Sequence, residues 1–200
     1  QPTVSTPFYE DPEMIKVRRE AIDEALRDWV TNLMISASIS ELKEEAWGVV
    51  QDLCRHFALL DIDDCVNVPF IEVKSHKLAN EALVTFATSR LNGFLRAIID
   101  CSSTENPSIR EVAENTLVFL KDCYFELVAS QGLVEQVAAF QVLPLWYSSQ
   151  CYQPEWFQKQ GGCIGISILS SKLGFGKEWM LEHEIEFVKA LLYLLKDSSV

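Results

Sequence analysis

Residues 155–169, EWFQKQGGCIGISIL, place a cysteine among three glycines and are the stretch with the most apparent chemistry. A nucleophilic cysteine needs a base beside it, and the chain's three histidines lie far away in sequence. The glycine patterns of phosphate loops and of dinucleotide sites are both absent. In a helix, glycine costs about 0.5 to 1 kcal/mol relative to alanine, so we expect close helix packing to offset that cost.

Zinc-ligand spacings are incomplete. Cys54 and His56 are two residues apart and lack a second pair at finger-like spacing. The stretch EHEIEF around His183 begins like a His-Glu-x-x-His zinc helix, but Phe187 occupies the place of the second histidine. A solvated acidic helix face explains this stretch, and the sequence predicts no metal site.

Residues 61–72 have the length of a calcium-binding EF-hand loop and carry oxygen donors at four of its ligand positions. The sixth position, where the sharp turn needs glycine, is Val66, and Pro69 restricts the chain further. An acidic surface loop is the interpretation that we prefer. With no paired acid and base in a shared cleft either, we predict no catalytic residues, no cofactor and no enzyme activity.

The composition favours a protein whose partners are other proteins. The 200 residues carry a formal net charge of −12, which argues against binding a phosphate backbone. No apolar run reaches 18 residues, so no membrane partner is expected. The six cysteines are scattered through apolar helical patterns and are expected to be reduced. The chain opens without methionine, which we interpret as an internal piece of a longer protein.

Apolar residues recur with helical period along most of the chain. Asp11-Pro12-Glu13 and Asn106-Pro107 are good helix starts, Gly132 is expected to end a helix, and Pro144 and Pro154 are expected to break the following stretch. Only residues 70–73 alternate like a strand. The predicted helix pairs are 11–60, 75–130 and 133–173, followed by a last helix over 178–197, with residues 61–75 as a loop.

The same periodicity predicts which side of each helix faces inward. The expected inward residues of the first two helices are Ile15, Ile22, Leu26, Trp29 and Leu33, then Leu42, Ala46, Val49, Leu53, Phe57 and Leu60. Those of the helix after Asn106 are Ile109, Ala113, Leu117, Leu120, Tyr124 and Leu127, and those of the last helix are Leu181, Ile185, Val188, Leu192 and Leu195.

About seven amphipathic helices in successive hairpins of roughly 40 residues indicate an all-α, HEAT-like α-solenoid. We expect residues 1–200 to be an internal segment of a larger solenoid of this kind. A compact bundle is the alternative, but helices of such different length fit it poorly.

Residues 151–197 carry a set of features in a fixed order. They are Cys151-Tyr152, Trp156, Lys159, Gly161-Gly162, the helix face of Gly165, Ile166 and Leu169, then Trp179 and Phe187-x-Lys-Ala-Leu-Leu. This stretch resembles the HEAT-repeat region of the TRRAP family, the large pseudokinase scaffolds of transcription coactivator complexes. The resemblance covers about a quarter of the chain, and we interpret Trp156, Gly161, Gly162, Gly165, Trp179 and Phe187 as structural packing residues.

The resemblance implies a nuclear, non-catalytic scaffold that is shared by SAGA-type and other histone acetyltransferase complexes. Its expected partners are transcription activators and other coactivator-complex subunits, without direct contact to nucleic acid or membrane. Two alternatives remain open: a HEAT-repeat nuclear transport receptor, or the solenoid of an active kinase related to phosphatidylinositol 3-kinase. An intact, inactive or absent kinase domain elsewhere in the protein would separate them.

Overall fold

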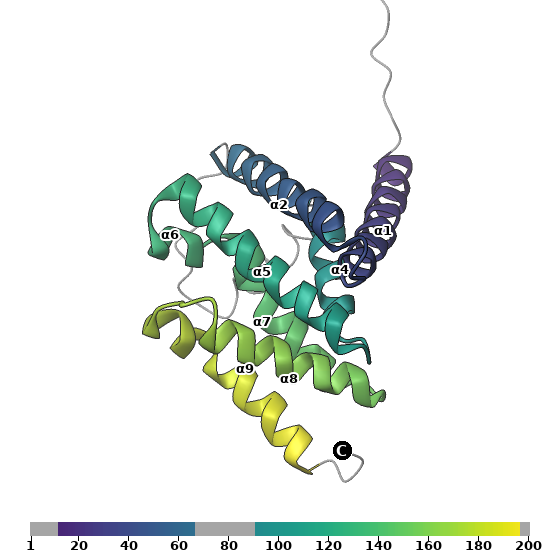
Figure 1. The fold of residues 1–200 in the computed structure, drawn as a ribbon. Coiled ribbons are helices and arrows are strands. Elements are labelled where there is room, and N and C mark those ends of the chain that lie inside the picture. The colour runs from purple at the N-terminus through teal and green to yellow at the C-terminus, as the bar shows by residue number, and fades with distance from the viewer. Residues whose placement is uncertain (1–11, 67–90, 197–200) are drawn as a thin grey trace, which may run out of the picture.

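A computed structural model of the chain describes residues 12–66 and 91–196 (Figure 1). These residues form eight helices and no strand: α1 (Pro12–Ala37), α2 (Lys43–Val66), α4 (Asn92–Ser102), α5 (Pro107–Val128), α6 (Gln131–Glu135), α7 (Ala138–Gln150), α8 (Trp156–Ser171) and α9 (Lys177–Lys196). The predicted all-α fold is therefore confirmed. The strand-like residues 70–73 and most of the predicted loop 61–75 lie outside the described ranges.

The helices follow one another through the fold in chain order. Helix α1 packs on α2 and α4, α2 packs on α5, and α4 packs on α5, α7 and α8. Helix α9 then packs on α7 and α8. Figure 1 shows α1 and α9 at opposite ends of this arrangement. Stacking of consecutive helical hairpins is the architecture of a HEAT-like solenoid.

Helix α4 is the centre of the described core, because neighbours cover it on nearly every side. Its contact with α1 is close: a Cβ at Gly93 would lie 2.5 Å from the carbonyl oxygen of Asp23. Two polar contacts fix the same crossing. Arg27 Nε donates to Asp100 Oδ2 at 2.5 Å, and Asn92 Nδ2 donates to Asp23 Oδ2 at 3.2 Å.

The start of α5 agrees with the sequence and its end does not. The Asn106 side chain accepts a hydrogen bond from the Ser108 N–H at 2.9 Å, and Pro107 fills the first helical position. Helix α5 ends at Val128 because Ala129 adopts a left-handed conformation, φ 50°, and its N–H closes on the Phe125 carbonyl at 2.8 Å. Gly132, expected to end this helix, instead lies inside α6.

Two other predicted boundaries differ. Helix α2 continues to Val66, so the part of the candidate calcium loop that the structure describes is helical. Pro144 lies inside α7 rather than ending a helix. Proline removes one helical hydrogen bond, but Phe140, Leu143 and Tyr147 on the same helix are completely buried, and this packing outweighs the loss.

The prediction of the inward face is confirmed for α5 apart from Leu127. For α1, α2 and α9 much of it is wrong. In α1 the buried residues are Val30, Met34 and Ala37, whereas Ile15, Ile22 and Trp29 are exposed. Leu42, directly before α2, and Val49 within it are exposed. In α9 all five predicted residues are exposed, and the buried ones are Trp179, His183, Phe187 and Ala190. These helices carry apolar residues on more than one side, so period alone does not select the inward side.

Candidate functional site

The three glycines of α8 lie where this helix meets the rest of the fold most closely. A Cβ at Gly161 would lie 2.6 Å from Cα of Ser103, in the turn between α4 and α5. At Gly162 it would lie 2.7 Å from the Tyr147 carbonyl oxygen and 2.6 Å from Cys151 Sγ. At Gly165 it would overlap the ring of Tyr147. A larger side chain at any of the three requires a neighbour to shift.

Tyr147 connects three helices at this junction. Its side chain is completely buried on α7, its ring lies against Gly165 of α8, and its hydroxyl is 3.3 Å from Ser102 Oγ of α4. Burial raises the pKa of Tyr147 to about 12, so the hydroxyl stays protonated and can donate to Ser102. The sequence indicates the glycines through their helical cost, but no local signal identifies Tyr147 or Ser103 as their partners.

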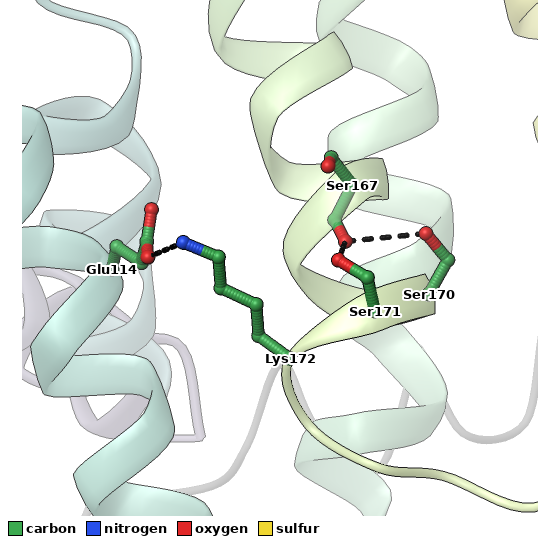
Figure 2. Close-up of polar contacts among 5 residues, drawn as sticks. All are labelled: Glu114, Ser167, Ser170, Ser171 and Lys172. Carbon is green, nitrogen blue, oxygen red and sulfur yellow. Dashed lines mark hydrogen bonds and ion pairs between the residues drawn. The ribbon is translucent and has the colours of Figure 1, made fainter.

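An ion pair also ties the end of α8 to α5. Figure 2 shows Lys172 reaching across to Glu114. Beside it, the hydroxyls of Ser170 and Ser171 donate to the Ser167 carbonyl at 3.2 Å and 2.5 Å. Such bonds from a serine hydroxyl to the carbonyl of the preceding turn are common in helices.

The thiols near the glycines are unsuited to nucleophilic catalysis. Burial raises the pKa of Cys151 to about 12 and also raises the pKa of Cys163. A reactive cysteine needs the opposite shift, because the thiolate is the nucleophile. Cys54, Cys101, Cys123, Cys151 and Cys163 are all free of disulfides.

Trp179 and Phe187 belong to an aromatic cluster between α7 and α9, which we define as Phe140, Phe175, Trp179, His183 and Phe187. Ring centroids are 5.3 Å apart for Phe140 and Phe175, and 4.4 Å apart for Phe175 and Trp179. His183 lies 4.6 Å from Trp179, and its burial lowers its pKa to about 4. A neutral histidine packed among aromatic rings is a core residue, so the interpretation of this stretch as a solvated acidic helix face is wrong at His183, although Glu182 and Glu184 beside it are exposed.

Trp156 differs from the other predicted packing residues because it is 52% exposed, at the first position of α8. Its ring lies 6.1 Å from that of Phe157. Tyr152 and Tyr193 are also exposed, with ring centroids 4.8 Å apart. The structure therefore does not bring Trp156 into the core with Trp179 and Phe187.

One pocket of about 290 Å³ opens where the α4–α5 turn meets α7 and α8. Its lining residues are Asp100, Ser103, Thr104, Glu105, Gln150, Phe157 and Gln158. The set contains no nucleophile paired with a base, and the Asp100 carboxylate is already bound by Arg27. The pocket therefore offers polar binding groups without a catalytic arrangement.

Residues 12–66 and 91–196 form neither a cluster of metal ligands nor a membrane-spanning helix. No three metal-ligating side chains within these ranges come close enough together to hold an ion. None of the helices described there is both long and apolar enough to span a bilayer.

Successive helical hairpins stack on one another in chain order through packed helix contacts. This arrangement defines the chain as a helical repeat protein of the HEAT type. The model of the family described as the Tra1 HEAT repeat ring region matches residues 5–200, and the chain belongs to this family. No solved structure gives a significant match.

Three relatives illustrate the similarity. The chain is 24% identical over 187 residues to the Transformation/transcription domain-associated protein of Homo sapiens, covering 90% of this chain. It is 24% identical, over an alignment of 206 positions that covers 100% of this chain, to the SAGA complex/NuA4 acetyltransferase complex subunit TRA1 of Saccharomyces cerevisiae. It is 23% identical over 191 residues, 93% of the chain, to the corresponding Schizosaccharomyces pombe subunit. The chain spans 5% of the length of each relative.

Proposed function

We propose that the chain is a non-catalytic scaffold segment of a transcription coactivator subunit, in histone acetyltransferase complexes of the SAGA type. The observation that supports this most is the family match over residues 5–200. Two of the relatives are named as subunits of SAGA and NuA4 acetyltransferase complexes. In this role the segment helps bring the complex to activators and chromatin.

The chemistry of the described residues agrees with a role without catalysis. The buried thiols have raised pKa values, and the pocket at the α4–α5 turn lacks a nucleophile and base. What the segment offers instead is surface on stacked helices, which in repeat proteins commonly binds other proteins.

We further propose that its partners are proteins and that it acts in the nucleus. A net charge of −12 opposes direct binding to DNA or RNA and suits basic protein surfaces or subunit contacts. Acetyltransferase complexes act on chromatin, which supports the proposed action in the nucleus.

Within this role, we assign two structural tasks to the predicted packing residues. Gly161, Gly162 and Gly165 let α8 approach α7 and the α4–α5 turn, and Trp179 and Phe187 attach α9 through the aromatic cluster. Trp156, being half exposed, is assigned to the surface instead.

The proposal is tested by tagging the parent polypeptide in its own cells and purifying it from nuclear extract. Mass spectrometry should then identify acetyltransferase and chromatin-reader subunits in the eluate. Recovery of a small GTPase with basic cargo would instead identify a transport receptor, and an intact kinase domain in the parent sequence would identify an active kinase.

A further inference from the structure

Two thiols of the chain lie against each other where α7 meets α8. Cys151 follows the last residue of α7 and is completely buried, whereas Cys163 lies inside α8 and is partly exposed. A Cβ at Gly162 would lie 2.6 Å from Cys151 Sγ, so the Cys151 sulfur rests on the α8 backbone directly beside Cys163. The thiol of Cys151 also hydrogen-bonds that of Cys163. The two sulfurs are therefore neighbours on separate helices.

The two thiols differ in access and in hydrogen bonding. Burial raises the pKa of Cys163, and the hydrogen bond that its sulfur accepts from Cys151 partly offsets this rise. Burial, with Cys163 beside it, raises the pKa of Cys151 to about 12. Since the thiolate is the reactive form, Cys163 is the thiol that reacts first with a reagent from solution, and Cys151 is held in reserve behind it.

A second pair of neighbouring thiols lacks this access. Burial and the neighbouring Cys123 of α5 both raise the pKa of Cys54 of α2. Cys54 is 0% and Cys123 is 4% exposed. An oxidant dissolved in water therefore does not reach either sulfur of this pair while the chain is folded, and the pair serves as an internal control.

We propose that Cys151 and Cys163 form a modification site, in which a peroxide oxidises them to a reversible disulfide that ties the end of α7 to α8. In this reaction Cys163 meets the peroxide and Cys151 closes the disulfide. This inference depends on the contact between α7 and α8 and not on the proposed scaffold function, so either can fail alone.

The reaction balances in two steps. The Cys163 sulfur attacks one oxygen of hydrogen peroxide, the O–O bond breaks, and the leaving hydroxide takes up the thiol proton to form water. The Cys151 sulfur then attacks the sulfenic acid at Cys163, the S–O bond breaks, and a second water leaves with the Cys151 proton. One peroxide is reduced by two electrons, and two thiols are oxidised to one disulfide.

The environment of the two thiols sets the speed of each step. Because burial keeps both thiols protonated, the first step is slow, and the site responds to sustained peroxide rather than to a brief exposure. The second step is fast by comparison, since the two sulfurs are already in contact within one molecule. A dithiol reductant restores both thiols by thiol–disulfide exchange.

Peroxide treatment of the full-length polypeptide tests the proposal. The protein is exposed to hydrogen peroxide, its remaining thiols are blocked with N-ethylmaleimide, and disulfide-linked peptides are quantified by mass spectrometry without reduction. We expect at least a tenfold excess of the Cys151–Cys163 link over a Cys54–Cys123 link, and its loss after dithiothreitol. No Cys151–Cys163 link, equal amounts of both links, or pairing of Cys163 with another cysteine would overturn the proposal.

Two conservative variants separate the roles of the two thiols. In Cys151→Ser the sulfenic acid at Cys163 has no thiol to close on, so dimedone should label it at least tenfold more than in the wild type. In Cys163→Ser the buried Cys151 should stay reduced under the same peroxide. Oxidation of Cys151 in Cys163→Ser, or equal dimedone labelling of Cys163 in Cys151→Ser and the wild type, would contradict the assigned roles.

Discussion

The close approach of α8 to Tyr147 predicts that alanine has opposite effects at two helical glycines. At Gly165 a Cβ would overlap the Tyr147 ring, which is fully buried and held by its hydroxyl contact with Ser102. At Gly48, inside α2, a Cβ meets nothing within 4 Å. Gly48→Ala is therefore a matched control for the same chemical change.

The magnitudes follow from two opposing effects. Alanine in a helix interior is favoured over glycine by about 0.5 to 1 kcal/mol, and Gly48→Ala should gain this amount. Overpacking a core costs about 1 to 3 kcal/mol, and a ring that cannot shift without losing a hydrogen bond places Gly165→Ala near the upper end. We expect a net loss of about 2 kcal/mol at Gly165.

Hydrogen exchange of the full-length polypeptide measures both changes in the assembled protein. Amides of α7 and α8 should exchange about thirtyfold faster in Gly165→Ala, since each 1.4 kcal/mol is about a factor of ten. Amides of α2 should exchange at the same rate or more slowly in Gly48→Ala. Unchanged or slower exchange around Gly165 would refute the close-packing account of the α8 glycines.

Three further predictions concern the core and the ends of the fold. Burial lowers the pKa of His183 from 6.5 to about 4, so between these pH values the unfolded chain binds a proton that the folded chain does not. The free energy of unfolding should therefore fall by about 3 kcal/mol as pH drops from about 6.5 to about 4. Denaturant unfolding at several pH values should show that this part of the loss is absent in His183→Phe; equal pH dependence in both would contradict it. With pKa values of about 12, Cys101 and Cys151 should be alkylated by iodoacetamide at pH 8 roughly a thousandfold more slowly in the native protein than in urea, and comparable rates would show that the thiols are accessible. The isolated 200-residue chain, with Leu181, Ile185 and Leu192 of α9 exposed, should self-associate in sedimentation experiments, and a soluble monomer with a sharp two-state melt would argue against an internal solenoid segment.

Local sequence rules predict the helices of this chain well because helix starts are local events. Asn106 and Pro107 begin α5 as expected, and Pro154 lies between α7 and α8. The end of α5 is less predictable, since Ala129 adopts the left-handed conformation that glycine usually supplies. The prediction of the buried side of α9 fails for a different reason. The helix carries two rows of apolar residues, and contacts with α7 and α8 determine which row is buried.

The candidate site shows the same limit. Helical cost singles out Gly161, Gly162 and Gly165 in the sequence, yet their partners lie on other helices and in the α4–α5 turn. Trp156 illustrates the converse, because an aromatic residue beside a buried helix face need not itself be buried. Which residues of other helices contact the glycines is set by the tertiary fold. Local sequence patterns therefore do not predict these contacts.

We propose above that the parent protein is a non-catalytic scaffold of an acetyltransferase complex. The most direct measurement is histone acetylation by the tagged polypeptide purified from nuclear extract, before and after high salt strips its associated subunits. We expect acetylation by the intact eluate and none by the stripped polypeptide. An eluate without acetyltransferase activity, or activity that stays with the stripped polypeptide, would contradict it.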